Sequence, residues 1–324
     1  MLMIELKGLT KHYGQTVAVQ DLTFTVRPGQ VTGFLGPNGA GKSTTMRMIL
    51  GLDKPTAGTA LIGGMPYRQL KHPLREVGAL LDAKWVHPNR SARAHLQWMA
   101  ASNGIPKSRV EEVLRLVGLS EVAGKKAGGF SLGMSQRLGL AGALLGDPKV
   151  LLFDEPVNGL DPEGILWIRR FMQRLAAEGR TVLVSSHLLS EMAQTAEHLV
   201  VIGRGRLISD STTKEFIARA SEASVRVRSP QLDQLRSLLT SNGMTVREDG
   251  TDTDGSAIVV TGVTSDAVGK LAGANDITLF ELAPMHASLE EAFMRMTGGE
   301  VQYHGQTETL PDRMDRDEAM GGAL

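Results

Sequence analysis

The chain has 324 residues, enough for one large or two moderate domains with a sizeable core. Its 35 lysines and arginines balance 35 aspartates and glutamates, which disfavours a nucleic-acid binder that relies on a broad basic surface. The absence of cysteine excludes disulfides and thiolate metal sites. No run approaches the roughly 18 apolar residues that span a bilayer, and the N-terminus lacks an apolar secretory core. We therefore expect a soluble chain whose role at a membrane would come through a partner.

Strand and helix patterns alternate along the first part of the chain. LTFTVRPG (22–29) alternates apolar and polar residues and ends in a Pro-Gly turn, so with the early IEL it predicts a small antiparallel sheet. The apolar runs VTGFLG, VLLFD, TVLVSS and LVVIG do not alternate, which is typical of parallel strands covered on both faces. Helical spacing over 165–175 and 188–199 completes the pattern of an α/β domain, predicted over 1–215. Residues from about 88 to 143 look helical throughout and are interpreted as a helical insertion.

A second pattern begins after this domain. SVRVRSP, QLDQLRSLLTSNG, SAIVVTGV, DAVGKLAG and ITLFELAP predict a small α+β domain over 216–300. In the closing SLEEAFMRMTGG, Ser288 and Glu291 have the spacing of a helix capping box. Residues 301–324 are polar and without periodicity, so we predict a disordered tail.

The stretch GPNGAGKST follows an apolar run and precedes a helical pattern, which is the context of a P-loop. Its glycines let backbone N–H groups turn towards phosphate oxygens, and the following helix adds its positive N-terminus. Lys42 is expected to reach the β- and γ-phosphates of ATP, and the Ser43 hydroxyl to bind Mg²⁺. The nucleotide-binding residues predicted in this loop are Gly36, Pro37, Asn38, Gly39, Ala40, Gly41, Lys42, Ser43 and Thr44.

The stretch VLLFDEP ends an apparently buried strand in two adjacent acids, Asp154 and Glu155. Two unpaired carboxylates at the edge of a core are costly, because burial and mutual repulsion both oppose ionisation. A P-loop beside them would supply compensating cations. Asp154 could then hold Mg²⁺, and Glu155 could polarise a water that attacks the γ-phosphate. The alternative is an ordinary acidic loop start.

With these motifs and the sequence between them, residues from about 3 to 211 resemble the ATP-binding subunit of an ABC transporter. FSLGMSQRLGLAGALLGDPKVLLFDEPVNGLDP is similar to the signature helix, Walker B strand and D-loop of that family, in the same order and spacing. TVLVSSHLLSEM is similar to its switch-histidine segment. The single cassette and the appended small domain resemble the bacitracin- and daunorubicin-resistance type of exporter ATPase. The fold that the resemblance implies is a P-loop NTPase of the ABC type.

The resemblance also implies roles for individual residues. Tyr13 resembles the aromatic residue on which adenine stacks, although a tyrosine before a glycine can be a simple turn residue. His187 resembles the switch histidine that contacts the γ-phosphate, although a histidine at a strand end is often structural. The catalytic residues implied in this way are Lys42, Glu155 and His187.

Residues of the signature and the D-loop would act in trans, on ATP held by a second subunit. Ser131, Gly133 and Asp161 have this role by resemblance, and Asp161 also fits an N-cap for the helix that follows. The signature departs from the usual LSGGQ, because Leu132 and Met134 replace a glycine and a glutamine. A side chain at Leu132 can limit how closely a phosphate approaches the backbone.

The Q-loop position after VGALL holds Asp82 instead of glutamine. An acid can reach Mg²⁺ or a water there, but its contact is charged where an amide would be neutral. We therefore predict Asp82 among the nucleotide-binding residues and, with Ser43 and Asp154, among the ligands of Mg²⁺. The other seven histidines lack metal-binding spacing, so no zinc site is expected.

The function implied is ATP hydrolysis that drives export of a small molecule or drug. One cassette per chain makes a C₂ homodimer the simplest closed assembly. A membrane permease is the expected partner and would place the chain on the cytoplasmic face of the membrane, and no nucleic acid is expected. Two alternatives remain: a soluble ABC-type ATPase with a regulatory, ribosome-linked or DNA-linked role, and an ATP sensor whose C-terminal domain binds an effector. The sequence does not indicate the transported substrate, which the permease would select.

Overall fold

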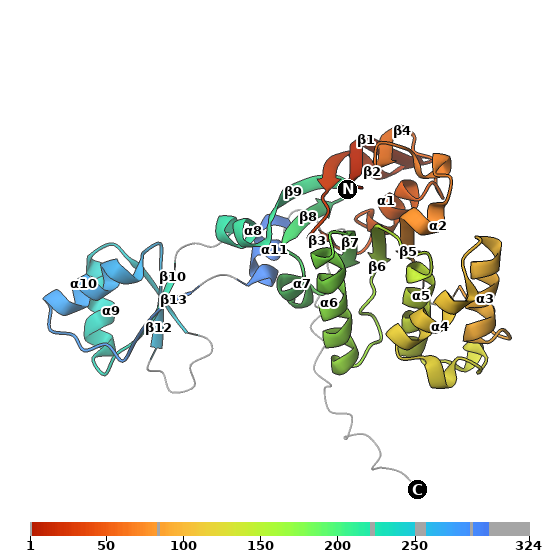
Figure 1. Cartoon of the computed structure of the whole chain (residues 1–324). Helices are drawn as coiled ribbons and strands as arrows, with labels where there is room; N and C mark the ends of the chain where they lie inside the picture. The colour runs from red at the N-terminus through yellow and green to blue at the C-terminus, as the bar shows by residue number, and fades with distance from the viewer. Residues whose placement is uncertain (1, 83–84, 221–223, 250–256, 286–287, 298–324) are drawn as a thin grey trace, which may run out of the picture.

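The computed structural model describes residues 2–82, 85–220, 224–249, 257–285 and 288–297 (Figure 1). Within these ranges the β-strands form three sheets. No helix in the described part of the chain is both long and apolar enough to cross a membrane. The tail predicted over 301–324 lies outside the described residues.

A mostly parallel sheet forms the centre of the N-terminal domain. In the described residues its spatial order is β5 (Val77–Leu80), β6 (Val150–Asp154), β7 (Thr181–Ser186), β3 (Val31–Leu35), β8 (His198–Gly203) and β9 (Arg206–Thr212). Neighbouring strands are parallel except for β8 and β9, which are antiparallel. The parallel strands expected from the four apolar runs are therefore confirmed, and β9 extends the sheet at one edge.

Two hydrophobic cores cover the two faces of this sheet. One core includes side chains of α5 (Leu132–Leu144), α6 (Pro162–Ala177) and α7 (Leu189–Thr195), and the other includes side chains of α1 (Lys42–Ile49). In β6, Leu151 and Phe153 face the first core, while Val150 and Leu152 face the second. Because both faces of the strand are buried, each of these positions is apolar and the sequence does not alternate.

The predicted antiparallel sheet lies against the second core. It contains β2 (Thr16–Val26), β1 (Ile4–Tyr13) and β4 (Ala57–Ile62) in that spatial order. Gly14, with a positive φ of 58°, begins the turn that joins β1 to β2. The backbone N–H of Gln20 donates to the carbonyl of Gly205 over 2.8 Å, which connects β2 to the β8–β9 turn. This hairpin places Tyr13 at the end of β1.

The region expected to be a helical insertion, 88–143, contains a group of helices between β5 and β6. It contains α3 (Ala92–Ser102), α4 (Lys107–Leu116) and α5, and the short α2 (Pro73–Glu76) precedes β5. Figure 1 shows α3, α4 and α5 gathered beyond the β5 edge of the sheet.

Within this group, His95 of α3 is a buried histidine surrounded by aromatic rings. Its ring centroid lies 4.9 Å from that of Trp85 and 6.0 Å from that of Trp98. Neither ring nitrogen has a hydrogen-bond partner among the described residues. Burial, and secondly the charge of Arg90, hold the pKa of His95 below its usual value of 6.5. His95 therefore packs as a neutral aromatic side chain.

Replacing His95 with phenylalanine is expected to make the fold less sensitive to acid. Because the pKa of His95 is lower in the folded state, the unfolded chain takes up this proton first, and stability is lost as the pH falls below about 6.5. His95→Phe cannot take up a proton and retains the aromatic contacts. Its melting temperature should therefore fall by roughly a few degrees less than that of wild type between about pH 7 and pH 5. His12→Phe, at an exposed position, is the control; equal losses in wild type and His95→Phe would contradict the assignment.

The C-terminal domain has a split βαβ topology. Its elements follow the order β10 (Ser224–Arg228), α9 (Leu232–Ser241), β11 (Thr245–Glu248), β12 (Ala257–Thr261), α10 (Ser265–Ala274) and β13 (Glu281–Met285). The spatial strand order is β11-β12-β10-β13, and all neighbours are antiparallel. This is the ferredoxin-like arrangement. Side chains from both helices and from β10 and β12 form a core of its own, so the α+β class expected from the sequence is confirmed.

The closing helix, which the sequence assigned to this small domain, packs in the N-terminal core instead, together with a helix that straddles the predicted boundary at 215. Phe216 of α8 (Thr213–Ala220) and Leu289 and Phe293 of α11 (Leu289–Thr297) lie in the same hydrophobic cluster as β3, β7 and α7. Figure 1 shows α11 beside α8. The predicted range 216–300 is therefore corrected to the span from β10 to β13. Helical periodicity identifies an apolar face but does not say which core that face covers.

The capping box predicted for α11 is confirmed. The backbone N–H of Ser288 donates to Glu291 Oε2 over 3.0 Å, and the backbone N–H of Glu291 donates to Ser288 Oγ over 3.1 Å. These reciprocal bonds satisfy two backbone donors at the start of the helix.

Candidate active site

The segment between β3 and α1 forms a tight loop at the carboxyl end of the parallel sheet. Gly41 precedes α1 with a left-handed φ of 101°. A side chain at Gly36 would lie 2.5 Å from the carbonyl oxygen of Ile202, and one at Gly41 would lie 2.5 Å from that of Ala18. Because only glycine fits these two positions, the loop can follow the close backbone path of a phosphate cradle.

The other loop residues form the accessible part of this cradle. Asn38, Gly39 and Ser43 are exposed, and Thr44 is half-buried. Ser43 lies in the first turn of α1, where backbone N–H groups have no partner within the helix and the helix dipole is positive. The structure therefore brings the predicted nucleotide-binding residues 36–44 into one loop and one helical turn that suit an anion.

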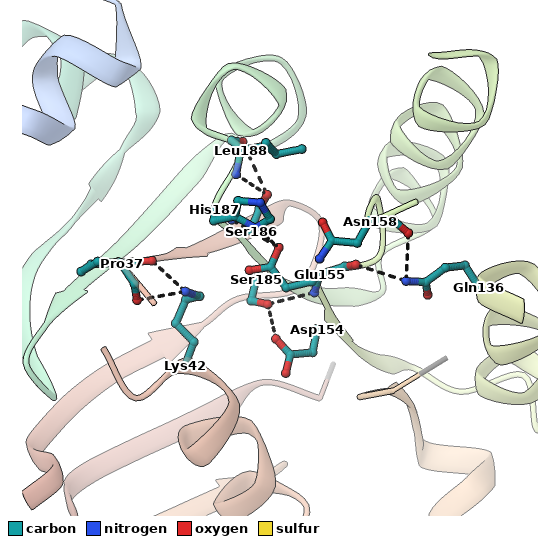
Figure 2. Close-up of polar contacts among 11 residues, drawn as sticks. Pro37, Lys42, Gln136, Asp154, Glu155, Asn158, Ser185, Ser186, His187 and Leu188 are labelled. Carbon is teal, nitrogen blue, oxygen red and sulfur yellow. Dashed lines mark hydrogen bonds and ion pairs between the residues drawn. The ribbon is translucent and has the colours of Figure 1, made fainter. Parts of the chain in front are cut away.

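Lys42 is buried within this loop. Its Nζ donates to the carbonyl oxygens of Gly36 over 2.7 Å and Pro37 over 3.3 Å (Figure 2). Burial lowers the pKa of Lys42, and the charges of Glu155 and Asp154 act in the opposite direction. The ammonium group thus contacts the loop carbonyls, while its effect on the two acids acts through space.

Asp154 and Glu155 lie where β6 ends beside β7, and their carboxylates contact different residues. Ser185 Oγ donates to Asp154 Oδ1. His187 Nδ1 lies 2.7 Å from Glu155 Oε2, and the backbone N–H of His187 donates to the same oxygen over 3.3 Å. Figure 2 shows both contacts at the carboxyl end of the strands. These hydrogen-bond partners reduce the cost of placing two acids next to each other.

The backbone of Glu155 is held at both its N–H and its carbonyl. Its φ of 51° is left-handed, which is uncommon for a residue other than glycine. Its N–H donates to Ser185 Oγ over 3.0 Å, and its carbonyl accepts from Asn158 N–H over 3.2 Å and from Gln136 Nε2 over 3.5 Å. Sequence reasoning missed Ser185 and Gln136. The available signals were a hydroxyl at the end of a buried strand and an amide in a largely apolar helix.

The oxygen donors near this edge suit Mg²⁺. Asp82 is exposed two residues beyond β5, and β5 pairs with β6, so Asp82 and Asp154 leave the sheet at the same edge. Their carboxylates and the Ser43 hydroxyl are hard oxygen donors of the kind that Mg²⁺ prefers. The described residues contain no group of three or more His, Cys, Asp or Glu side chains that could hold a metal. A donor set this small fits Mg²⁺ that binds through one or two carboxylates together with nucleotide phosphates.

Tyr13 presents a half-exposed ring at the end of β1. Its hydroxyl donates to Asp53 Oδ2 over 2.9 Å, and Lys11 Nζ lies 4.8 Å from the ring centroid. Partial burial and then the Asp53 carboxylate raise the pKa of Tyr13. The contact with Asp53 fixes the edge of the ring, and an exposed aromatic face can stack on a purine.

The signature segment begins α5. Ser131 caps the helix, because its Oγ accepts from the backbone N–H of Met134 over 3.2 Å. Leu132, which replaces the usual glycine, lies against the D-loop of its own chain, since a side chain at Gly159 would come within 2.1 Å of it. The Cβ position of Gly133 is 3.4 Å from the carbonyl oxygen of Gly159. The structure therefore brings the signature and the D-loop together.

Asp161 begins α6 at the end of that D-loop. Its Oδ1 accepts from the backbone N–H of Gly164 over 3.0 Å. The expected N-cap is therefore confirmed. The role of Asp161 at a subunit boundary stays a prediction.

Two families of known sequences match the chain. A family described as ABC transporter matches residues 19–158, and a family described as a domain of unknown function matches residues 223–290. The first match contains the phosphate loop and both acids. The second covers the split βαβ domain.

Individual relatives match over longer ranges. An uncharacterized ABC transporter ATP-binding protein of Bacillus subtilis, YhcH, is 38% identical over 305 residues, which are 91% of this chain and 96% of the relative. The bacitracin transport ATP-binding protein BcrA of Bacillus licheniformis is 44% identical over 211 residues, 64% of this chain and 69% of the relative. Among solved structures, the dimeric structure of a bacterial ABC transporter cassette aligns with a TM-score of 0.60 and 25% identity, over 65% of this chain and 98% of that one.

The fold and the site together define a P-loop ATPase with a signature helix ahead of its Walker B strand. Because the Bacillus subtilis relative matches along nearly its whole length, the chain belongs to the ABC transporter ATP-binding proteins. The resemblance drawn from the sequence motifs is confirmed, and with it the activity that this family carries out, the binding and hydrolysis of ATP.

Proposed function

We propose that this chain works as one half of a head-to-tail cassette dimer that powers export of a small molecule through a separate membrane permease. The observation that carries this proposal is the convergence of Lys42, Asp154, Glu155 and His187 at the carboxyl ends of β3, β6 and β7. A cation, a metal-binding acid, a second acid and a histidine at one sheet edge are the parts that phosphoryl transfer to water requires.

Each of these residues has a separate task in the proposed site. Lys42 supplies positive charge to the β- and γ-phosphates. Ser43, Asp82 and Asp154 hold Mg²⁺, which neutralises phosphate charge when it is bound. Glu155 accepts a hydrogen bond from the attacking water and polarises it. The 2.7 Å contact from His187 keeps the Glu155 carboxylate at the sheet edge.

ATP would join two copies of the chain. Ser131, Gly133 and the N-terminus of α5 offer a hydroxyl and backbone N–H groups to the γ-phosphate held by the partner, with Asp161 at the boundary. Leu132 packs against its own D-loop on one side and is 43% exposed on the other, so its side chain stands at the start of α5. The dimeric cassette with similar fold supports this assembly, and a C₂ pair closes it.

The helical group offers a surface for a membrane permease. Trp85 and Trp98 are 45% and 54% exposed there and lie on either side of one residue, His95, so they form an exposed apolar patch of the kind that marks protein interaction sites. The relative from Bacillus licheniformis is described as a bacitracin transport protein, which supports export of a small molecule or drug. Binding to a permease would place the chain on the cytoplasmic face of the membrane.

The alternative functions have less support. The relatives named above are transport proteins, so they do not favour a ribosome-linked or DNA-linked ATPase. The split βαβ domain could bind an effector, as an ATP sensor would require. None of its described contacts favours that function over a structural one.

Co-purification with a membrane protein tests the proposed partner. The tagged chain, recovered from detergent-solubilised membranes of its native host, should carry a protein with several transmembrane helices. Trp98→Ala should reduce that recovery by at least about tenfold, because an aromatic anchor contributes 2 kcal/mol or more at an interface. Leu116→Ala, at another exposed apolar position of the helical group, is the control and should have no effect. Recovery only with ribosomes or DNA would contradict the proposal.

A further inference from the structure

Ser185 lies between the two acidic residues of the site in a position that the proposed mechanism does not yet use. It is the fifth residue of β7 and is 0% exposed. In the sheet register it pairs with Asp154 of β6 on one side and with Phe34 of β3 on the other. Paired residues of neighbouring strands project to the same face, so the side chains of Ser185 and Asp154 meet.

The hydroxyl of Ser185 uses both its donor and its acceptor on these acids. Its Oγ–H donates to Asp154 Oδ1, and its oxygen accepts the backbone N–H of Glu155 over 3.0 Å (Figure 2). A hydroxyl has one donor and two acceptor positions, so both bonds can exist together. One side chain therefore fixes the rotamer of one acid and the backbone of the next.

These contacts differ from those of ordinary buried hydroxyls in this chain. Thr45 donates to the carbonyl of Gly41, and Thr195 donates to the carbonyl of Glu191, each within its own helix or at its start. Thr181, on the same strand as Ser185, reaches a distant segment, but it too donates to a backbone carbonyl, that of Leu2. Ser185 differs because it donates to a side-chain carboxylate, that of Asp154, and accepts from the backbone of the adjacent acid.

The backbone of Glu155 needs this support. Its left-handed φ of 51° is a conformation that side chains other than glycine adopt at a cost, and it persists only where neighbours hold it. Ser185 holds the N–H side of this residue, while Asn158 and Gln136 contact its carbonyl. Loss of the Ser185 hydroxyl would release the N–H side and the Asp154 carboxylate at once.

We propose that Ser185 is a positioning residue for ATP hydrolysis, which orients Asp154 towards Mg²⁺ and Glu155 towards the attacking water. This inference rests on the roles proposed above for the two acids. It assigns no direct contact between Ser185 and the nucleotide. Residues that hydrogen-bond to metal ligands and fix their orientation typically change metal affinity or activity by about 10- to 100-fold when they are replaced.

Two substitutions of equal shape test the hydroxyl itself. Ser185→Thr retains the hydroxyl, and Ser185→Val replaces it with a methyl group. A third variant, Ser185→Ala, removes the hydroxyl without adding any atoms to the buried site. For each, we would measure kcat, the affinity for a non-hydrolysable ATP analogue without Mg²⁺, and the factor by which Mg²⁺ raises that affinity. Ser185→Val and Ser185→Ala should lower kcat and the Mg²⁺ factor by about 10- to 100-fold, with Mg²⁺-free affinity unchanged. Ser185→Thr should stay close to wild type.

Thr32→Val is the matched control. Thr32 is a buried hydroxyl on β3 of the same sheet, and its Oγ1 has no hydrogen-bond partner among the described residues. Its replacement should leave all three measurements unchanged, because no hydrogen bond is lost. A merely structural serine would affect folding and Mg²⁺-free binding, not the response to Mg²⁺.

The outcomes separate this inference from the proposed function. Equal kcat and equal Mg²⁺ response in Ser185→Thr and Ser185→Val, or wild-type values in Ser185→Ala, would overturn the role of Ser185. If those results occur while Glu155→Gln is inactive, the proposed site stands and only the role of Ser185 fails. If Glu155→Gln hydrolyses ATP at the wild-type rate, the proposed roles of the acids fail as well.

Discussion

Glu155→Gln is expected to lose nearly all ATP hydrolysis while it keeps its affinity for ATP. The amide has almost the same shape as the carboxylate but cannot accept a proton from the attacking water. We therefore expect kcat to fall by about 10²- to 10⁴-fold, the usual contribution of a general base. Phosphate release measures the rate, and titration with a fluorescent ATP analogue measures the affinity.

Glu121→Gln is the control for this experiment. Glu121 is an exposed acid in the helical group, so the same chemical change there should leave the rate unaltered. Glu155→Gln with at least a tenth of the wild-type rate would show that another group activates the water.

Lys42→Ala is expected to lose most of its affinity for ATP. The Lys42 ammonium is held in the phosphate loop by the carbonyls of Gly36 and Pro37, and alanine leaves no cation at that position. Removing one partner of a desolvated charge pair typically costs about 2–5 kcal/mol, which corresponds to a Kd at least about 30-fold higher. Calorimetric titration with Mg²⁺-free and Mg²⁺-loaded ATP measures the change.

Folding can be separated from binding in Lys42→Ala. Burial lowers the pKa of Lys42, so its charge is costly to bury and its removal should not lower the melting temperature. Lys125→Ala, at an exposed position, should retain full affinity. An unchanged Kd in a folded Lys42→Ala protein would refute the phosphate-cradle assignment.

Local sequence patterns predicted the parts of the fold that depend on local chemistry. The glycines of the phosphate loop are forced by close contacts at Gly36 and Gly41, and this spacing is visible in the sequence. The unalternating run of β6 reflects burial on both faces, and the capping box at Ser288 and Glu291 is a bond between residues three positions apart. In each case the pattern that reveals the feature lies within a few residues, even where the contact that requires it, such as that of Gly36 with Ile202, comes from a distant segment.

Patterns failed where distant segments decide the outcome. The apolar face of α11 predicted a helix, but only the fold shows that it covers the N-terminal core. The four exposed or half-buried residues of β11 gave no strand signal of their own, and its strand forms by pairing with β12. In the same way, Ser185 and Asp154 are 31 positions apart in the sequence and become neighbours only because β6 pairs with β7. No local signal marks a serine that will serve an acid on another strand.

The contacts of the charged residues also depended on the fold. Sequence reasoning expected Lys42 to compensate Asp154 and Glu155. Its charge does interact with both acids through space, but their direct contacts are with Ser185 and His187. The lysine is held by its own loop. A motif identifies which residues gather, whereas the orientation of each side chain follows from the strands that carry it.

The most direct test of the account is the molar mass of Glu155→Gln in solution with and without ATP, measured by light scattering after size exclusion. If the triphosphate is held between the phosphate loop of one copy and the signature helix of another, the mass should be that of one chain without ATP and of two chains with Mg²⁺ and ATP. A single-chain mass under both conditions, in protein that still binds ATP, would contradict the central claim that the nucleotide joins two copies.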